Sequence, residues 1–226
     1  IDMHEALQPD PFTYESFNAF FTRELRPGVR PIAPDAHALV SPVDGTVSQL
    51  GRLTAGALLQ AKGMQYSCAG LLADGPAAAR YHEGSFACLY LAPYNYHRIH
   101  MPCDAVLRAT RYVPGQLFSV NAATARTVPD LFARNERVVC EFDTGDGPLC
   151  LVLVGALFVG SIETVYAGEI NPPASRGGRV TTVTDGNGCT GTGTYTLVIG
   201  CPTITVTNPA GSIGSVGVFF AKAFTQ

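Results

Sequence analysis

Leu149–Gly160 (LCLVLVGALFVG) is the longest wholly apolar run of the chain, and it decides the fold. A helix that crosses a bilayer needs about 20 residues, which is more than this run contains. The run also includes two glycines, Gly155 and Gly160. It therefore predicts a buried β-strand, or a pair of strands, in the core of the protein.

Short strands of the same kind recur through the middle of the chain. Between Arg30 and Pro173, alternating or apolar segments are separated by turns of Gly, Pro and Asp. This pattern predicts an α+β fold that is mainly antiparallel β, with few helices and a compact β core. The expected strands include Leu39–Val40, Gly45–Leu50, Phe86–Leu91, Val138–Phe142 and Leu149–Val154.

Composition excludes several classes of protein. The 226 residues are 46% hydrophobic and 15% charged, with a net charge of -3. Such a chain can bury a core without disulfides, and it has no basic arm for nucleic acid, so we expect no nucleic-acid partner. The seven cysteines contain no C-x-x-C pair. Several lie in apolar runs, and those up to Cys150 predict a reduced, intracellular protein.

An aromatic helix is expected near the N-terminus. Over Asp10–Leu25, large apolar residues recur at steps of three and four after a Pro and a Thr, which is typical of an amphipathic helix. These residues are Phe12, Phe17, Phe20, Phe21 and Leu25. Their common face either packs on the core, which we favour, or contacts a membrane surface.

The composition changes sharply after residue 176. Beyond it the only charged residues are Arg179, Asp185 and Lys222, while Thr, Gly and Val alternate. A change this abrupt usually marks a domain boundary. We therefore predict two domains, a core over residues 1–176 and a β-rich, Thr/Gly-rich tail over residues 177–226.

Two histidines follow the apolar run Phe86–Pro93. They are His97 and His100 of Tyr96–Pro102 (YHRIHMP), and imidazole is the side chain whose ordinary pKa lies nearest neutral pH. Two imidazoles at the end of a strand suggest proton transfer, although a surface or structural role is the common alternative. Because no carboxylate ligand is adjacent to the pair, we expect no metal site.

Asp44 is the candidate partner of these histidines. It lies in Ser41–Val47 (SPVDGTV), where Asp-Gly is ordinarily a turn that opens a strand. Beside an imidazole, the same carboxylate would orient the ring, and the ring would activate a nucleophile. A second charged cluster, Arg134–Arg137 (RNER), is expected to be a solvated loop.

Taken together, these segments resemble the phosphatidylserine decarboxylase family. The resemblance covers about residues 10–175, and its blocks occur in the family's order. The blocks are Phe20–Arg26 (FFTRELR), Arg30–Ile32 (RPI), Ser41–Gly51 (SPVDGTVSQLG), Gln60–Gly63 (QAKG), Tyr96–Pro102 (YHRIHMP), Tyr112–Asn121 (YVPGQLFSVN), Leu131–Arg137 (LFARNER) and Val154–Gly168 (VGALFVGSIETVYAG).

The resemblance implies a lyase of phospholipid biosynthesis, which converts phosphatidylserine into phosphatidylethanolamine and carbon dioxide. The family's cofactor is a pyruvoyl group, formed from a Ser of the chain itself when the zymogen cleaves. Its ketone accepts the electrons that departing carbon dioxide leaves behind. Asp44 and His100 match the relay that acts on this Ser, with Asp44 orienting the ring and His100 taking the hydroxyl proton. His97 matches the position that assists decarboxylation.

The same resemblance implies a location and a partner. The partner is phosphatidylserine in a membrane surface, reached through the helix expected over Asp10–Leu25. We therefore expect a peripheral protein of the cytoplasmic membrane. A homo-oligomer is left open.

The chain departs from the family at the pyruvoyl precursor. The family has this Ser in a Leu-Gly-Ser-Thr motif, and nothing between Pro173 and Gln226 reproduces it. Gly211-Ser212 matches the dipeptide alone, so Ser212 fits the motif only in part. Val180–Gln226 instead resembles part of a bacterial immunoglobulin-like repeat, in which Thr and Val alternate along exposed strands.

Two explanations fit this departure. Either the catalytic tail has been replaced in a fusion, or a diverged family member carries its Ser elsewhere. We favour the fusion, which predicts a chain that keeps the decarboxylase core, does not mature and stays in one piece. The alternative function, from a different class, is a non-catalytic module that binds a lipid surface or serves adhesion.

Overall fold

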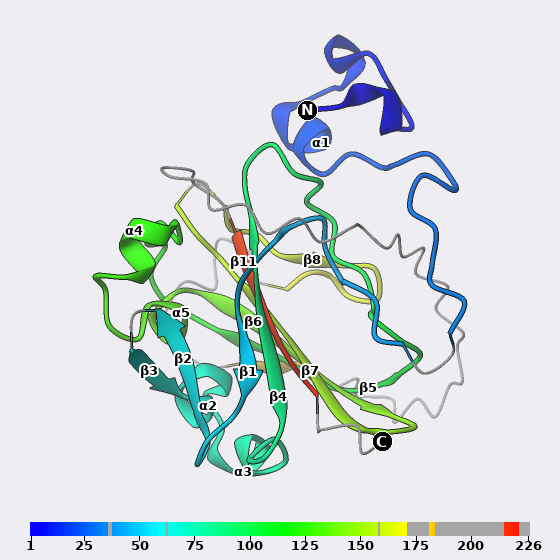
Figure 1. Ribbon diagram of the computed structural model, residues 1–226. Helices are drawn as coiled ribbons and strands as arrows, with labels where there is room; N and C mark the ends of the chain where they lie inside the picture. Colours follow the sequence, from blue (N-terminus) through cyan, green and yellow to red (C-terminus); the bar gives the residue numbers. More distant parts are fainter. Residues whose placement is uncertain (36–37, 62, 158, 171–180, 184–214, 222–226) are drawn as a thin grey trace.

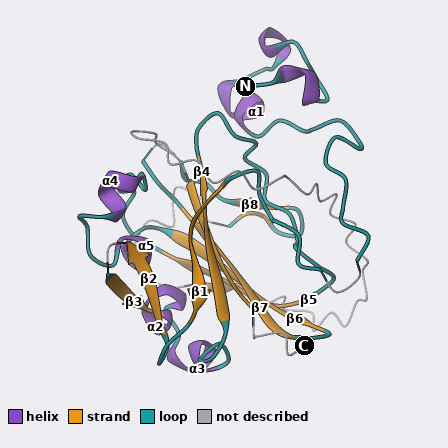
Figure 2. Cartoon of the chain, in the orientation of Figure 1, coloured by secondary structure: helices purple, strands orange, loops and turns teal. Residues whose placement is uncertain are grey.

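A large antiparallel sheet forms the centre of the computed structural model, which describes residues 1–35, 38–61, 63–157, 159–170, 181–183 and 215–221 (Figures 1 and 2). Within these residues, seven strands pair in the order β1-β4-β11-β7-β6-β5-β10. Their bounds are β1 Thr46–Arg52, β4 Ser85–Leu91, β5 Val106–Val113, β6 Arg137–Thr144, β7 Gly147–Val154, β10 Thr181–Val183 and β11 Ser215–Ala221. The predicted α+β class with mainly antiparallel sheet agrees with this architecture.

The strands β6 and β7 show why the central segments are almost wholly apolar. Along β7, Leu149 and Leu151 pack in one cluster, whereas Cys150 and Val152 pack in another on the opposite face. Side chains alternate between the two faces of a strand, so a sheet covered on both sides needs apolar residues at every position. The strand predicted over Leu149–Val154 is confirmed for this reason, as are those at β1, β4 and β6.

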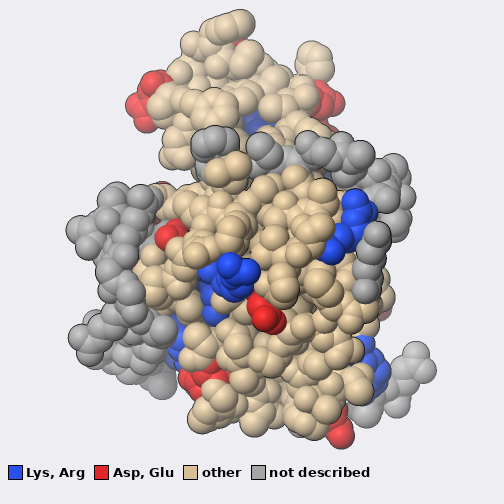
Figure 3. Space-filling model, turned by 90° about the vertical axis from the view of Figure 1, so that its left-hand side faces the viewer, with Lys and Arg blue, Asp and Glu red and all other residues tan. Residues whose placement is uncertain are grey.

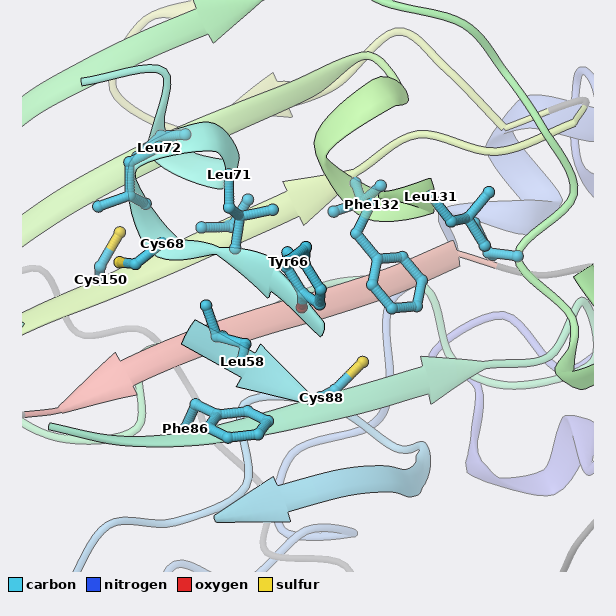
Figure 4. Close-up of a cluster of buried hydrophobic side chains, with 14 of the residues drawn as sticks. Leu58, Tyr66, Cys68, Leu71, Leu72, Phe86, Cys88, Leu131, Phe132 and Cys150 are labelled. Carbon is cyan, nitrogen blue, oxygen red and sulfur yellow. The ribbon is translucent and has the colours of Figure 1, made fainter. Parts of the chain in front are cut away.

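The larger apolar cluster is covered by a second, two-stranded sheet and by short helices (Figure 4). These elements are β2 Ala57–Ala61, β3 Met64–Ser67, α2 Cys68–Leu72, α3 Gly75–Ala79, α4 Ala122–Ala125 and α5 Leu131–Arg134. Leu58, Tyr66, Leu71 and Phe132 are buried there against Phe86 of β4. The five described cysteines all have free thiols, and four of them are buried.

The N-terminal helix is much shorter than predicted. In place of one helix over Asp10–Leu25, the structure has a 3-10 turn, η2 Pro11–Thr13, and a five-residue helix, α1 Phe17–Phe21. Ser16 causes the break, because its hydroxyl accepts the N–H of Ala19 and starts a new helix there. Another 3-10 turn, η1 Met3–Glu5, precedes them. Among the described helices, none is both long and apolar enough to cross a membrane.

Two further sequence predictions are wrong. Leu39–Val40 is not a strand. The cluster Arg134–Arg137 is not a solvated loop, because Asn135, Glu136 and Arg137 are nearly inaccessible to solvent. The reason is that their polar groups have partners inside the protein.

Arg137 illustrates how such a charge is accommodated. Its guanidinium donates hydrogen bonds to the carbonyls of Leu71 at 2.6 Å, Gly70 at 2.8 Å and Asn135 at 2.8 Å. Burial lowers the pKa of Arg137 to about 10. The side chain satisfies carbonyls around α2 that would otherwise lie buried without a donor.

Two strands of the main sheet come from the segment predicted as a separate tail. β10 pairs with β5, and β11 lies between β4 and β7. The proposed division into residues 1–176 and 177–226 stays a prediction. Ser212 lies outside the described residues.

Loops from distant parts of the chain meet at one edge of the sheet. β4, β5 and β7 run in the same direction and end there, because each is separated from the next by one antiparallel strand. The strands β1, β6 and β11 run the opposite way, so they begin at this edge. The blocks that contain Asp44, His97 and His100 therefore meet at one edge, although they are far apart in sequence. A small hairpin, β8 Glu163–Thr164 and β9 Gly168–Glu169, follows β7.

Gly45 permits a close backbone approach at this edge. A Cβ atom at this position would lie 2.7 Å from the backbone oxygen of Tyr90 and 3.3 Å from its carbonyl carbon. Backbone cannot yield as a flexible side chain can. The absence of a side chain at Gly45 therefore allows the start of β1 to lie against the end of β4.

Gly45→Ala should lower the free energy of unfolding by about 1–3 kcal/mol, because the added methyl overlaps the Tyr90 carbonyl. The control is Gly75→Ala at the start of α3, where nothing lies within 4 Å of an added Cβ. Urea denaturation followed by circular dichroism measures both variants. Equal midpoints for Gly45→Ala and the unaltered chain would contradict this packing.

Candidate active site

Backbone hydrogen bonds join the segment before β1 to the segment after β4. The N–H of His100 donates to the carbonyl of Pro42 at 2.9 Å, and that of Val40 donates to Pro102 at 3.0 Å. Asp44 follows Pro42 by two residues and precedes β1. The structure thus brings all three predicted site residues, Asp44, His97 and His100, to the same edge of the sheet.

Arg30 holds the carboxylate of Asp44. Its Nε donates to Oδ1 at 3.1 Å and to Oδ2 at 2.9 Å, and its Nη2 lies 2.5 Å from Oδ2. The same guanidinium reaches Glu5, with Nη1–Oε1 at 2.9 Å and Nη2–Oε2 at 2.7 Å. Hydrogen bonds to these two carboxylates raise the pKa of Arg30, and the bond to Arg30 lowers the pKa of Glu5. Two carboxylates shared by one guanidinium leave one negative charge in this cluster.

His100 bonds to Tyr96 and not to Asp44. Its Nε2 lies 2.9 Å from the Tyr96 hydroxyl, and the two rings stack with centroids 5.5 Å apart. The buried Nδ1 has no hydrogen-bond partner among the described residues. Burial lowers the pKa of His100, Arg98 lowers it further, and the negative charge of Asp44 opposes both. Asp44 therefore acts on His100 through its negative charge, and no direct hydrogen bond joins the two side chains.

His97 has a defined tautomer. Its Nδ1 lies 3.0 Å from the carbonyl of Asn95, and since a carbonyl can only accept, Nδ1 carries the proton. The other nitrogen, Nε2, is buried and has no partner within the described part of the chain. The ring lies against Phe21 of α1, with centroids 3.9 Å apart. Burial, and to a lesser extent Arg23, lower the pKa of His97.

This arrangement supplies groups for proton transfer. Neutral imidazoles with lowered pKa values can accept a proton near neutral pH, and His97 presents a free lone pair at Nε2. The hydroxyl of Ser119, in the loop after β5, is a further buried polar group without a partner in the described residues. Buried polar groups are nearly always satisfied in proteins, so such unpartnered atoms are candidates for contact with a bound group.

Sequence reasoning missed the residues that hold this site. Arg23 and Arg30 lie in segments that resemble the family, but the sequence indicates no role for either. Tyr96 lies next to His97, and the sequence indicates no function for it. A weak signal existed, because Arg is seldom buried and both arginines lie in the resembling blocks. Nothing in a single sequence indicates which carboxylate an Arg will meet.

The pH dependence of the free energy of unfolding tests the burial of the His97 ring. Because the pKa of His97 lies below its ordinary value of 6.5, the unfolded chain binds this proton at higher pH than the folded chain does. The contribution of His97 to the free energy of unfolding should therefore diminish as pH falls below about 6.5. Phe21→Ala should expose the ring and raise its pKa toward the ordinary value.

Phe17→Ala is the control, because Phe17 stacks on Phe21 and is 76% exposed. NMR titration of the histidine ring signals gives each pKa. A His97 pKa at or above 6.5 in the unaltered chain would contradict the burial of the ring against Phe21.

Comparisons with known proteins identify the family of the chain. A family model described as phosphatidylserine decarboxylase matches residues 17–185. Phosphatidylserine decarboxylase proenzymes from Pectobacterium atrosepticum and Shewanella baltica are each 58% identical to the chain, over 174 and 177 residues. These alignments cover 76% and 78% of this chain, and 51% and 61% of the relatives. The proenzyme of Sodalis glossinidius is 56% identical over 174 residues, which are 76% of this chain and 59% of that protein.

The chain therefore spans about half to three fifths of the length of these curated relatives. The family model covers well over half of the chain, and the quoted blocks lie within the matched region. The match leads to one conclusion: the chain belongs to the phosphatidylserine decarboxylase family.

Proposed function

We propose that this protein is a phosphatidylserine decarboxylase, which converts phosphatidylserine into phosphatidylethanolamine and carbon dioxide. The observation that supports this most is the meeting of Asp44, His97 and His100 at one edge of the sheet, where His97 Nε2 and His100 Nδ1 are buried without hydrogen-bond partners among the described residues. The relatives named above carry this activity in their names. The reaction needs proton transfer beside an electron acceptor, and the site offers the first of these.

A pyruvoyl group fits the free atoms of this site. The proposal is that His97 Nε2, His100 Nδ1 and Ser119 Oγ, which lack partners among the described residues, bind or orient its oxygens and those of the substrate. When present, the group supplies an electron acceptor that no ordinary side chain provides. His97 would then deliver or hold a proton at Nε2, while its Nδ1 stays bonded to Asn95.

Ser215 is our proposal for the precursor of this group. It is the first residue of β11 and is paired in register with Leu91, the last residue of β4. This register supports a position at the sheet edge near His97 and His100, and Gly214 precedes Ser215 as the family motif requires. Ser212, the partial match to the motif, lies three residues earlier in the sequence and outside the described residues.

Asp44 and His100 are proposed to serve the cleavage step. The Ser hydroxyl would give its proton to His100 and attack the carbonyl carbon before it, so that an ester forms, the peptide C–N bond breaks and the Ser nitrogen takes up a proton. Loss of the Ser Cα proton would then break the Ser Cβ–O bond and release the preceding segment as a carboxylate, and water would release ammonia from the new N-terminus to leave the ketone. Asp44 would stabilise the protonated ring through its negative charge, while Arg30 keeps the carboxylate in place.

The substrate is proposed to be phosphatidylserine within a membrane, which the protein would bind from one side as a peripheral protein of the cytoplasmic membrane. The N-terminal segment lies next to the site, because Phe21 of α1 contacts His97. On this segment Phe12 and Phe17 are 95% and 76% exposed. In Figure 3 the centre of the upper lobe formed by this segment is mostly uncharged on the visible face, and acidic groups lie at its two sides. Exposed aromatic rings on an uncharged surface suit a membrane interface.

Mass spectrometry of the purified chain tests the cleavage. Cleavage before Ser215 should yield two fragments, and the one that begins at residue 215 should be lighter than its simple hydrolysis product by one ammonia. Ser215→Ala should stay intact, whereas Ser212→Ala should cleave normally. The prediction made from the sequence, that the chain stays in one piece, is still untested. An intact chain would support that prediction and contradict the role of Ser215.

Vesicles of phosphatidylserine in phosphatidylcholine test the reaction. The cleaved protein should form phosphatidylethanolamine, and His97→Ala should slow the reaction by about 10²–10⁴-fold while leaving cleavage unchanged. His100→Ala should instead prevent cleavage. Vesicle binding without any product in the cleaved protein would overturn the decarboxylase and favour the non-catalytic lipid-surface module.

A further inference from the structure

A pocket of about 400 Å³ lies between the N-terminal segment and the loop after β4. Its lining includes Leu7, Asn18 of α1, Arg23 and Arg98. None of the three candidate catalytic side chains is among the residues that line it. The pocket is therefore distinct from the proposed reaction centre, although His97 lies close enough for Arg23 to influence its pKa.

Arg23 is the unusual member of this lining. The residue is only 5% exposed, and its Nε and Nη1 have no hydrogen-bond partner anywhere in the described residues. Its guanidinium carbon lies 5.6 Å from the centre of the Phe20 ring. Buried N–H groups without acceptors are costly, because they have lost water, and the contact with the Phe20 ring does not replace a hydrogen bond. Such a group is stabilised when an anion occupies the adjacent space.

The other charges near the pocket are already compensated or solvated. Arg98 donates from Nη1 to Glu24 at 2.9 Å and from Nε to the carbonyl of Thr22 at 2.7 Å. Glu15 also lines the pocket, but it is exposed, so water screens its charge. Among the described cations that line the pocket, Arg23 is thus the buried one whose Nε and Nη1 have no hydrogen-bond acceptor.

Glu5 and Asp44 do not fill this role. Both carboxylates are bonded to Arg30, so they act on Arg23 only at a distance.

We propose that Arg23 binds the phosphodiester group of a phospholipid in this pocket. A phosphodiester carries one negative charge, which matches one unpaired guanidinium, and its oxygens accept the N–H groups of Arg in a forked geometry. Exposed apolar side chains lie at the pocket and on the helix that contributes to it. Leu7 lines the pocket and is 54% exposed, and Phe17 lies on α1, which also contributes to the pocket. The proposal concerns binding alone and does not rest on the decarboxylase activity.

Calorimetric titration of the full chain tests this site. The probe is dihexanoyl phosphatidylglycerol below its critical micelle concentration, because it has a phosphodiester and no other charge. Inorganic phosphate is the second probe and distinguishes a lipid headgroup from free phosphate. We expect the lipid to bind more tightly than phosphate, and Arg23→Gln to weaken lipid binding by about tenfold or more.

Arg52→Gln is the control variant, because Arg52 lies at the end of β1 and does not line the pocket. Arg23→Gln should fold, since it removes a buried charge, and a denaturation curve verifies this. If it does not fold, the NMR signal of the Arg23 Nε–H in the unaltered chain must shift as the lipid is added. Unchanged binding by Arg23→Gln, an unmoved signal, or phosphate that binds as tightly as the lipid would each overturn the proposal.

Discussion

The structure depends on the contact between the segment before β1 and the segment after β4. Pairing of the two strands joins Thr46 to Tyr90, and backbone hydrogen bonds extend the contact to Pro42 and His100. Gly45 allows this because a side chain there would collide with the Tyr90 carbonyl. A carboxylate and two imidazoles that lie about fifty residues apart along the chain are thereby fixed at the same edge of the sheet.

Charge pairing then sets the state of each group at that edge. Arg30 takes both oxygens of Asp44 and also binds Glu5, so it ties the N-terminal segment to the candidate relay. Burial lowers the pKa values of both histidines, which favours their neutral forms. Burial of this kind makes imidazole a useful base near neutral pH. The same N-terminal segment presents exposed aromatic rings, so membrane contact and the site are connected through one short stretch of chain.

The sheet was largely predictable from the sequence, whereas the N-terminal segment and the polar contacts were not. Apolar residues on both faces of β7 leave an unbroken run that is easily recognised. The helix over Asp10–Leu25 was overestimated, because the cap at Ser16 starts a new helix within an otherwise periodic pattern. Asp44, His97 and His100 were identified through family blocks. The Arg30 and Arg23 environments depend on contacts between distant segments, which no local pattern reveals.

Asp44 acts on His100 at one edge of the sheet, and NMR titration of His100 in Asp44→Asn tests this most directly. The negative charge of Asp44 opposes the lowering of the His100 pKa. Removing that charge while keeping the shape of the side chain should therefore lower the pKa of His100 further. The same His100 pKa in Asp44→Asn and in the unaltered chain would contradict the interaction between Asp44 and His100.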